Sequence, residues 1–450
     1  MIHADLIIIG AGPGGYETAI SAAKKGLQVI LIEAQKTGGT CLNEGCIPTK
    51  CLHKNAEFLL ELGYADKLGV TVSASHPDIH QVMNRKNEIV STLSQGVKTL
   101  INIPGLNLVR GKAYFVDKHV VGIENTTEQY TAENIIIATG SITRILQIKG
   151  IDLPGVLTST SILNIDYIPQ SLCVIGGGVI GLEFASIFSA LGSHVTVIEF
   201  CKEILPNLDS EIAKRLRMTL KQRGINVITQ AGVTSLSQEE GGLSVSYECK
   251  GKTLQCLAQN VLCAIGRQAN VKALNLSDIG IEYNEKGITV DEYLQTNVKG
   301  VFAIGDINGK CQLAHAAVAQ GTVVLDYLLN QKTTVRLDLM PSVVFTIPEV
   351  ASIGMSEDLC KKNNLTYNIH KSFYRANGKA LAMNATDGIV KIISDSATGK
   401  ILGCHMYGAH ASDIIQEIVS LMYFSGTIND LRSIIHSHPT LSETILEAVK

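Results

Sequence analysis

Two cysteines, Cys41 and Cys46, stand five residues apart, and a lysine, Lys50, follows four residues beyond the second. On a regular helix, residues five apart point in different directions and are separated by more than one turn of rise. A disulfide requires Cα atoms within roughly 7 Å, so the two cysteines can pair only where residues 43–45 (Asn-Glu-Gly) leave helical geometry. A thiolate at the start of a helix is stabilised by backbone amides and nearby cations, which would keep such a cysteine reactive. The spacing also leaves open a second interpretation, two unrelated cysteines in a chain that has eleven.

A glycine-rich turn lies upstream of this pair. Gly10-x-Gly12-x-x-Gly15 follows a short apolar run typical of a buried parallel strand and precedes a segment with the pattern of an amphipathic helix. In a dinucleotide fingerprint the first glycine makes the tight turn, the second lets the backbone approach a pyrophosphate, and the third lets the helix pack on the strand. Glu33, 23 residues after Gly10, is placed to accept a hydrogen bond from a ribose hydroxyl. The predicted elements are strands at 4–9 and 28–32 and a helix at 16–25.

The same unit recurs 166 residues later, because Gly176 to Glu199 spans the same 23 residues as Gly10 to Glu33. Strands are predicted at 171–175 and 194–198, with a helix between them that reaches residue 191. Two copies predict two separate dinucleotide sites, one per domain, and the alternative is that one copy is a fold without a ligand. A carboxylate at Glu199 suits a free 2′-hydroxyl and repels a 2′-phosphate, so the second site is predicted to bind NAD rather than NADP.

Small and polar residues follow two further apolar runs. Residues 135–141 end in a turn with Thr139 and Gly140 that would permit close backbone approach to a ligand. Residues 300–306 end in Asp306, which could bind a polyol chain or cap the next helix, and the spacing leaves both open. From residue 340 onward the pattern predicts a separate α+β domain without a phosphate loop. The other predicted elements are helices at 55–63, 79–100, 411–424 and 441–449, and strands around 109–115, 343–346, 389–393 and 401–406.

Two histidines lie near the C-terminal end of the chain, in the segment Ile-His-Ser-His-Pro-Thr-Leu-Ser-Glu at 435–443. Pro439 favours an extended conformation for His438, and Thr440 with Glu443 has the spacing of a capping box for the last helix. One interpretation is therefore a capped helix that follows two exposed histidines. The other makes His438 a general base held by the Glu443 carboxylate, since an imidazole can accept a proton near neutral pH. The residues alone favour neither.

Composition restricts the class of protein. A chain of 450 residues predicts about three domains. With 46% hydrophobic and 18% charged residues it should have large buried cores. A formal charge of -3 gives no electrostatic case for nucleic acid or for an anionic membrane, and we expect no membrane span and no metal site. An odd number of scattered cysteines indicates a reducing compartment, so a cytoplasmic location is expected.

Together these motifs resemble those of the pyridine nucleotide-disulfide oxidoreductases over nearly the whole chain, and within that family its lipoamide-oxidising members. The resemblance rests on both glycine fingerprints (the second with Glu183), the Gly-Gly-Thr-Cys-x4-Cys-x3-Lys segment at 38–50, Ala-Thr-Gly at 138–140, Ala-Ile-Gly-Asp at 303–306, Leu-Ala-His at 313–315, and the His-x-His-Pro-Thr-x-x-Glu segment at 436–443. The family implies an α/β fold with two Rossmann-like dinucleotide-binding domains and a C-terminal α+β dimerisation domain. On this basis the FAD-binding domain covers 1–144, the NAD-binding domain 145–267, a central segment that completes the FAD site 268–338, and the dimerisation domain 339–450.

The resemblance also assigns residues to sites. The catalytic residues it implies are Cys41, Cys46, Lys50, Glu183, His438 and Glu443. The FAD residues are Gly10, Gly12, Gly14, Gly15, Glu33, Gly39, Thr40, Lys50, Thr139, Gly140, Asp306, Ala314 and His315. The NAD residues are Gly176, Gly178, Ile180, Gly181, Glu199 and Gly266.

The activity implied is oxidation of protein-bound dihydrolipoamide to lipoamide with reduction of NAD. In the family pattern His438 takes a proton from the substrate dithiol, the thiolate attacks Cys41, and Cys46 passes the electrons to FAD. Lys50, paired with Glu183, would stabilise charge beside the flavin. His438 and Glu443 would serve the disulfide of the other subunit of a homodimer. The implied partners are the lipoyl domains and acyltransferase core of a 2-oxo acid dehydrogenase complex, or the glycine cleavage H protein.

Departures from the pattern leave the reaction class intact. Glu44 places a charge between the two cysteines, and Cys51 adds a thiol beside Lys50. One alternative is a related reductase of the glutathione or mercuric type, which Glu199 disfavours because those enzymes generally use NADPH. The last cysteine is Cys404, so the cysteine pair expected near the C-terminus of mercuric reductases is also absent. A second alternative is a flavin-bound scaffold subunit, which intact Cys and His/Glu pairs disfavour.

Overall fold

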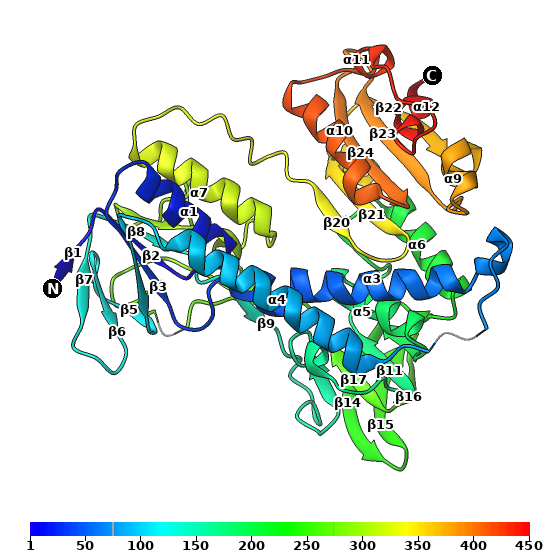
Figure 1. Ribbon diagram of the computed structural model, residues 1–450, viewed down its shortest axis with the longest axis horizontal. Helices are drawn as coiled ribbons and strands as arrows, with labels where there is room; N and C mark the ends of the chain where they lie inside the picture. Colours follow the sequence, from blue (N-terminus) through cyan, green and yellow to red (C-terminus); the bar gives the residue numbers. More distant parts are fainter. Residues whose placement is uncertain (74–75, 273) are drawn as a thin grey trace. The chain divides into compact units, whose positions relative to one another are not determined.

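A computed structural model describes residues 1–73, 76–272 and 274–450, and Figure 1 gives the order of its elements. The described chain has a mixed α/β fold with several sheets, which confirms the predicted fold class. It divides into two units, each built from separate stretches of sequence. The first unit comprises 1–51, 83–144 and 266–337, and the second comprises 52–82, 145–265 and 338–450. The four-segment domain division remains a prediction.

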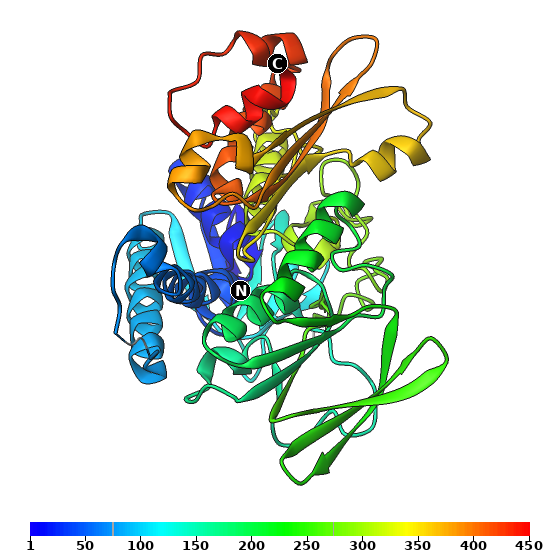
Figure 2. The same cartoon turned by 90° about the vertical axis from the view of Figure 1, so that its right-hand side faces the viewer.

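The first glycine fingerprint builds the main sheet of the first unit. Its strands are parallel, and apart from the edge strand at 106–110 they are almost entirely buried, as expected for apolar β-branched runs between helices. Helices α1 and α7 lie side by side in Figures 1 and 2 and in direct contact. In sheet order the strands are β19 (Val301–Ala303), β8 (Asn134–Ile137), β2 (Leu6–Ile9), β3 (Val29–Glu33) and β4 (Leu106–Arg110). The helices and the 3₁₀ turn are α1 (Pro13–Lys24), α2 (Gly39–Glu44), α7 (Ala314–Leu328) and η3 (Gly305–Asn308).

Smaller elements complete this unit. A four-stranded sheet consists of β1 (Ile2–His3), β7 (Gln129–Thr131), β6 (Val120–Ile123) and β5 (Ala113–Asp117). A two-stranded sheet pairs β9 (Ser141–Thr143) with β18 (Arg267–Ala269), and so joins the turn after β8 to a segment far along the chain. Two long helices run from one unit's residues into the other's, α3 (Cys46–Leu62) and α4 (Ile79–Ile101).

The second fingerprint builds an equivalent parallel sheet in the second unit. Its order is β10 (Val156–Thr158), β17 (Asn260–Cys263), β11 (Ser171–Ile175), β12 (His194–Ile198) and β13 (Asn226–Ile228). Four strands repeat the order of the first unit, since each fingerprint strand (β2, β11) lies between the next strand along the chain (β3, β12) and a later one (β8, β17). The outer strand differs, because β10 precedes its fingerprint whereas β19 follows its own. Helices α5 (Val179–Ala190) and α6 (Ser210–Gln222) accompany it. The green hairpins in Figure 2 are an antiparallel sheet of β14 (Ala231–Glu239), β15 (Gly242–Cys249) and β16 (Lys252–Ala258).

The C-terminal part of the second unit is an antiparallel sheet with helices. Its order is β20 (Ser342–Val344), β21 (Glu349–Gly354), β24 (Ile401–Gly408), β23 (Ile389–Asp395) and β22 (Tyr367–Phe373). Helix α10 packs on β21 and β24, and α12 packs on β22 and β23. The helices are α8 (Glu357–Lys362), α9 (Gly378–Ala382), α10 (Ala411–Tyr423), α11 (Ile428–Ser433) and α12 (Glu443–Val449). Short 3₁₀ turns lie at η1 (Ala65–Leu68), η2 (Ser161–Asn164) and η4 (Tyr374–Ala376).

Most predicted elements are confirmed, with ends that differ by a few residues: the helix expected from residue 16 begins at Pro13, and the region around 109–115 belongs to two strands, β4 and β5. The helix expected from residue 55 begins at Cys46, because Pro48 lies in its first turn, where a missing N–H costs no hydrogen bond. The last helix begins at Glu443 rather than residue 441. Within the described ranges, no helix is both long enough and apolar enough to cross a bilayer.

A buried lysine ties α6 to the C-terminal sheet inside the second unit. The Lys391 side chain is 1% exposed, and its Nζ lies 2.9 Å from Asp209 and 2.7 Å from Glu357. Asp209 also caps α6 by accepting from the amides of residues 211 and 212. Burial lowers the pKa of Lys391, but its hydrogen bonds to Glu357 and Asp209 outweigh burial and raise it. Hydrogen bonds from Lys361 and Lys391 lower the pKa of Glu357 from 4.5 to about 2.

We expect Lys391→Met to lower the free energy of unfolding by ~3–5 kcal/mol, because it leaves the buried Asp209 charge without its partner. Lys361→Met is the matched control, since the Lys361 side chain is 61% exposed and an ion pair screened by solvent contributes little to stability. Because the pKa of Glu357 is lowered by folding, its contribution is present above pH 4.5 and is lost as pH falls toward 2. Urea denaturation at pH 7 and pH 3 measures both effects, and equal losses in the two variants would contradict the assignment.

Candidate active site

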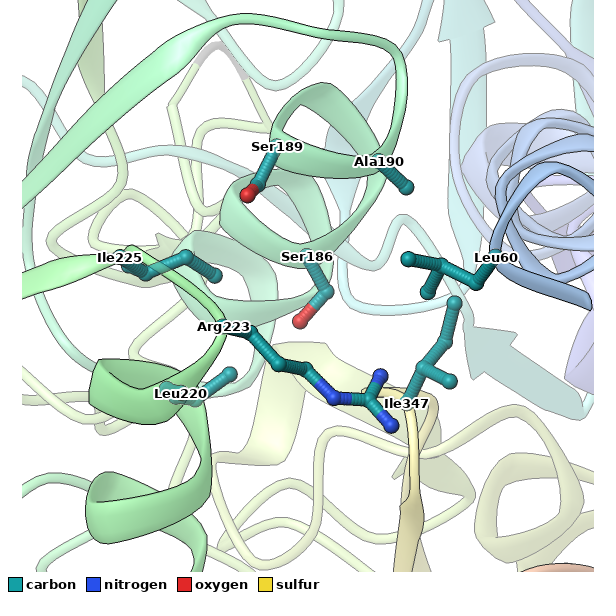
Figure 3. Close-up of a pocket in the computed structure, with 8 residues that line it drawn as sticks. All are labelled: Leu60, Ser186, Ser189, Ala190, Leu220, Arg223, Ile225 and Ile347. Atoms are coloured by element: carbon teal, nitrogen blue, oxygen red, sulfur yellow. The ribbon is translucent and has the colours of Figure 1, made fainter. Parts of the chain in front are cut away.

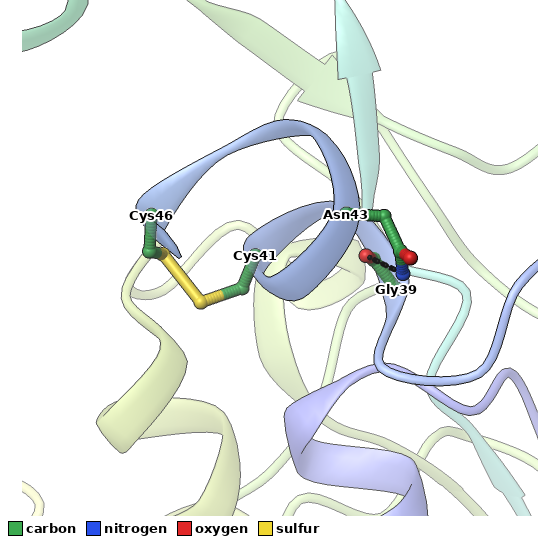
Figure 4. The surroundings of a disulfide bond; sticks show 4 residues. All are labelled: Gly39, Cys41, Asn43 and Cys46. Atoms are coloured by element: carbon green, nitrogen blue, oxygen red, sulfur yellow. Dashed lines mark hydrogen bonds between the residues drawn. A yellow bond between two sulfur atoms is a disulfide. The ribbon is translucent and has the colours of Figure 1, made fainter. Parts of the chain in front are cut away.

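Cys41 and Cys46 form a disulfide, with their Cα atoms 4.7 Å apart (Figure 4). Cys41 lies in α2, and Cys46 is the first residue of α3. The chain leaves helical geometry at Gly45, which has φ −144° and ψ −106°. The expected break between the two cysteines is therefore present, and it allows residues five apart in sequence to bond.

Close backbone packing explains the residue types between the cysteines. A Cβ atom at Gly45 would lie 3.0 Å from the carbonyl oxygen of Thr40, so a larger residue would push the two helices apart. The Asn43 amide donates to the carbonyl oxygens of Gly39 at 2.9 Å and Thr37 at 3.1 Å, which fixes the start of α2. Figure 4 shows the Gly39 bond. The sequence between the two sulfurs thus sets their geometry locally.

Three charged or reactive neighbours of the disulfide lie in the first unit. Lys50 lies one turn beyond Cys46, on the same face of α3. Burial raises the pKa of the Cys51 thiol, which makes this additional thiol a weak nucleophile. Glu44 is close enough to Arg267 for its charge to act on that guanidinium. The extra carboxylate between the cysteines therefore has a compensating cation.

The first glycine turn has the geometry of a dinucleotide fingerprint. Gly10 has φ +104°, and a Cβ there would lie 2.4 Å from the carbonyl oxygen of Ala138. A Cβ at Gly15 would lie 1.9 Å from the carbonyl oxygen of Gly10. Gly39 contacts Gly12, because its Cβ would lie 2.7 Å from the Gly12 Cα. The turn thus joins the strand, the helix and the start of α2.

The second turn repeats these contacts. Gly176 has φ +112°, and its Cβ would lie 2.5 Å from the carbonyl oxygen of Ala264. A Cβ at Gly181 would lie 2.0 Å from the carbonyl oxygen of Gly176. Gly178 is the N-cap of α5, as Gly12 is of α1. The sequence repeat is therefore a repeat of backbone geometry.

The acidic residue at the end of each glycine fingerprint accepts hydrogen bonds from backbone amides of its own turn. Glu33 accepts from the amides of Ala11 at 2.6 Å and Gln35 at 2.7 Å. Glu199, 7% exposed, accepts from the amides of Gly177 at 2.5 Å and Cys201 at 2.6 Å. Both carboxylates are thus fixed at the ends of β3 and β12, where the predicted ribose contacts require them.

The residues fit the two dinucleotides that the repeat predicts. Cβ atoms built at Gly178, Gly140 and Gly266 would meet nothing within 4 Å, and one at Gly12 would meet only the Gly39 Cα at 4.0 Å. These glycines therefore border open space beside the N-termini of α1 and α5 and the ends of β8 and β17, where a pyrophosphate would lie against backbone amides.

Asp306 bonds to a side chain and caps no helix. Its carboxylate accepts from Ser141 Oγ at 2.5 Å, and Ser141 also accepts from Arg267 Nε at 2.7 Å. Thr139 Oγ1 donates to the carbonyl oxygen of Asn270 at 3.1 Å. The helix-cap alternative for Asp306 is therefore wrong. Ser141, Arg267 and Asn270 were missed, although the pairing of the 140 and 266 turns through β9 and β18 explains why they meet.

Glu183 is 5% exposed in α5, and its Oε1 accepts from the backbone amide of Phe345 at 3.0 Å. Lys50 belongs to the first unit and Glu183 to the second, so their pairing remains a prediction. The amide of Phe345 was not foreseen, because no side-chain pattern reports a backbone donor.

His438 and Glu443 are in contact. His438 Nδ1 lies 3.0 Å from Glu443 Oε1, and the other carboxylate oxygen accepts from the Thr440 amide at 2.8 Å. The backbone bond to Thr440 and the bond to His438 lower the pKa of Glu443, so it is ionised at neutral pH. The His438 side chain is 81% exposed. An imidazole held at one nitrogen and open at the other can take a proton from a substrate.

The capping-box prediction for the last helix is half right. The Glu443 side chain does reach back to a backbone amide, but Thr440 Oγ1 donates to the carbonyl oxygen of Ser437, and the N-cap is Ser442. A second pair stands beside the first, because His436 Nε2 lies 2.9 Å from Glu417 Oε1. Both pairs hold the loop that presents His438.

A cavity of about 70 Å³ lies elsewhere in the second unit (Figure 3). Ser186 and Arg223 supply polar groups to its wall, and the rest is mostly apolar. Its volume suits about two water molecules, whereas a nucleotide pocket takes roughly 300 Å³ or more. The cavity is therefore too small to be the dinucleotide site of the second glycine fingerprint.

The remaining predicted site residues occupy the same turns and helix starts. Gly14 packs against Ala317 of α7, and Ala314 is the first residue of that helix. The others are Thr40 in α2, His315 in α7 and Ile180 in α5. Their contacts with cofactors remain predictions.

Comparison with known proteins defines the class. Residues 4–321 match the pyridine nucleotide-disulphide oxidoreductases, and residues 340–449 match the dimerisation domain of that family. The chain belongs to the pyridine nucleotide-disulphide oxidoreductase family. It is a flavoprotein disulfide reductase with a Cys41–Cys46 disulfide, and its cofactors are FAD and NAD.

Individual relatives are similar over their full length. The dihydrolipoyl dehydrogenase of Chlamydia muridarum is 38% identical over 450 residues, which cover 99% of this chain and 96% of that protein. The dihydrolipoyl dehydrogenase of Staphylococcus aureus is 35% identical over 458 residues, covering 100% and 96%. Among solved structures, the HOCl-induced flavoprotein disulfide reductase RclA from Escherichia coli has a TM-score of 0.89 and 30% identity, covering 99% of each chain.

Proposed function

We propose that this protein is a dihydrolipoyl dehydrogenase, which oxidises protein-bound dihydrolipoamide to lipoamide and reduces NAD to NADH. The observation that carries the proposal is the His438–Glu443 contact in a chain that also holds the Cys41–Cys46 disulfide. A dithiol substrate needs a disulfide to reduce and a base to make its thiolate. The named relatives at 35–38% identity support the same substrate.

The chain's own groups account for the thiol chemistry. His438, oriented by Glu443, takes a proton from one substrate thiol. The thiolate attacks Cys41, which forms a mixed disulfide and releases Cys46 as a thiolate. The second substrate sulfur then displaces Cys41, which closes the lipoyl ring and leaves Cys41 and Cys46 as a dithiol. Two electrons and two protons thus pass from substrate to enzyme.

FAD and NAD, when bound beside the two glycine turns, would supply the electron acceptor and the hydride chemistry by which the Cys41–Cys46 dithiol is reoxidised. Lys50, one turn beyond Cys46 on the same face of α3, is the residue that would stabilise negative charge beside the flavin. Glu183, fixed by the Phe345 amide, is a carboxylate suited to pair with Lys50.

The proposed assembly is a homodimer in which His438 serves the disulfide of the other subunit. The dimerisation domain supports this, and it exposes large apolar side chains that a partner could cover: Ile435 is 95% exposed and Phe424 81%. The proposed substrates are lipoyl domains on the acyltransferase core of a 2-oxo acid dehydrogenase complex, or the glycine cleavage H protein.

A second candidate is a reductase of the HOCl-induced type. The favouring observation is the TM-score of 0.89 to RclA, at 30% identity. That structure shares the disulfide reductase fold, and it does not distinguish a lipoyl dithiol from another substrate. Identity to the dihydrolipoyl dehydrogenases is higher, and we therefore rank this candidate second.

A substrate panel on the FAD-loaded dimer tests the first candidate. We expect steady NADH formation from dihydrolipoamide and NAD, with little reduction of glutathione disulfide or mercuric ion by NADPH. Absence of dihydrolipoamide oxidation from a protein with bound flavin and an intact disulfide would reject the proposal.

The choice of nicotinamide cofactor rests on Glu199. We expect Glu199→Ala combined with Lys202→Arg to shift kcat/KM towards NADP by ~1–3 kcal/mol, because a repulsion is removed and a charge-assisted hydrogen bond is gained. Each variant is assessed by the ratio of its kcat/KM values for NADP and NAD. Glu199→Ala also removes the acceptor of the Gly177 and Cys201 amides, and any general loss of activity from that change affects both values and cancels in the ratio. Lys202→Arg alone is the control and should shift the ratio little. An unmodified protein that already prefers NADP would refute the assignment.

A further inference from the structure

Two cysteines of the second unit, Cys173 and Cys256, lie on strands that pack against each other in one core. Cys173 lies in β11 and is 0% exposed, and Cys256 lies in β16 and is partly exposed. Side chains alternate along β16, which turns Cys256 and Ala258 inward while Leu257 is exposed. Both residues belong to the core that also contains Tyr247, and their thiols are close enough for each to shift the pKa of the other.

The interaction shifts the pKa values of the two thiols in opposite directions. Hydrogen bonds from the Cys173 thiol and from Thr196 lower the pKa of Cys256 to about 7, although burial opposes them. The same contact, with burial, raises the pKa of Cys173. Near neutral pH Cys256 is therefore partly a thiolate, and its neighbour is a protonated thiol. Such a pair has a nucleophilic sulfur that is partly open to solvent and a second sulfur already in contact with it.

We propose that Cys173 and Cys256 form a second redox pair, which a peroxide oxidises to a disulfide. The Cys256 thiolate attacks one peroxide oxygen, breaks the O–O bond and becomes a sulfenic acid, while the other oxygen leaves as hydroxide. The Cys173 sulfur then displaces the sulfenic hydroxyl as water. The two sulfurs lose two electrons together, and the peroxide becomes two water molecules once the hydroxide is protonated.

The strand packing is compatible with this bond. A disulfide needs Cα atoms within roughly 7 Å, and Cα atoms of β11 and β16 approach within 8 Å. The bond would fasten β16 to the strand that leads into the Gly176 turn. The proposal does not depend on the identity of the substrate, since it uses neither Cys41 nor Cys46.

Peptide mapping of the oxidised holoenzyme tests the pair. Protein with Cys41–Cys46 oxidised and nine other thiols is treated with hydrogen peroxide, blocked with N-ethylmaleimide and digested without reductant. Trypsin with a glutamate-specific protease yields residues 150–183, which contain only Cys173, and residues 253–267, which contain Cys256 and Cys263. We expect these peptides to be joined, lighter by two hydrogens, with fragmentation placing the bond at Cys256. Two titratable thiols per chain should be lost and should return with dithiothreitol.

Matched variants make the result decisive. Cys256→Ser should abolish the joined peptides, whereas Cys249→Ser, which removes the other sulfur near Tyr247, should keep them. A bond to Cys249 or Cys263, or further oxidation of Cys256 without any bond, would overturn the proposal. If Cys256→Ser fails to fold, the mapping of wild-type protein decides alone. Oxidation in urea supplies the random-pairing reference that the native yield must exceed.

Discussion

Refolding Cys41→Ser and His438→Ala chains together should restore about a quarter of wild-type activity, although each homodimer is nearly inactive. Random pairing makes about half of the dimers heterodimers. If His438 serves the other subunit's disulfide, one site of each heterodimer has both lesions and the other has an intact disulfide with an intact His438. Because heterodimers make up half of all dimers and each has one working site out of two, a quarter of all sites in the mixture are active. Lipoamide-dependent NADH formation, normalised to bound flavin, is the measurement.

The reverse arrangement gives a different result. If each chain used its own His438, every site in the mixture would carry one lesion and mixing would restore nothing. Heterodimers are counted by a charge tag on one chain, so their presence is known before activity is read. A mixture of two His438→Ala preparations, one tagged, is the control for refolding itself. Zero recovery with heterodimers present would contradict the shared site.

Cys46→Ser and Cys41→Ser should each reduce dihydrolipoamide oxidation by about 10³-fold or more, the scale for loss of a covalent catalytic group. Their spectra should differ. If Cys46 is the sulfur beside the flavin, Cys41→Ser keeps a Cys46 thiolate and a long-wavelength absorbance with bound flavin, whereas Cys46→Ser lacks it. Cys46 is the first residue of α3, where the helix dipole favours a thiolate.

Cys51→Ser is the matched control for this comparison. It removes a thiol from the same helix, but burial raises the pKa of Cys51 and keeps that thiol protonated. Activity and spectrum should therefore remain near wild type. A long-wavelength band in Cys46→Ser but not in Cys41→Ser would mean that the roles of the two sulfurs are exchanged.

Local pattern predicted much of this fold. The strands at 171–175 and 194–198 have the predicted bounds, since each is an apolar run between a turn and a glycine or acid. The glycine repeat predicted two turns, and both show the same close backbone approach. The Cys41–Cys46 bond depends on a backbone break that the types of residues 43–45 permit. These features lie within a few residues of sequence, which is why the sequence reports them.

Other contacts could not be predicted because they join distant segments or use backbone donors. The Phe345 amide reaches Glu183 across 162 positions, and Ser141 meets Asp306 across 165. The start of α3 was missed, since the helix was predicted from residue 55, whereas it begins at Cys46 and has Pro48 in its first turn. Thr440 was assigned a cap because spacing cannot show that its hydroxyl turns to Ser437.

The break at Gly45 also bears on how long a substrate could stay attached. Only four residues separate the two sulfurs, and the Asn43 bonds hold that segment from within, so reduction leaves the thiols as neighbours. Each thiol then has a high effective concentration toward the other, and intramolecular attack outruns attack by a dissolved thiol. A substrate caught on Cys41 is ejected by Cys46 unless its own second sulfur closes first. A monothiol should therefore attack Cys41 and be released again unchanged, whereas a dithiol that closes a ring is released in its oxidised form. The enzyme thus selects for paired thiols through the relative rates of two intramolecular attacks.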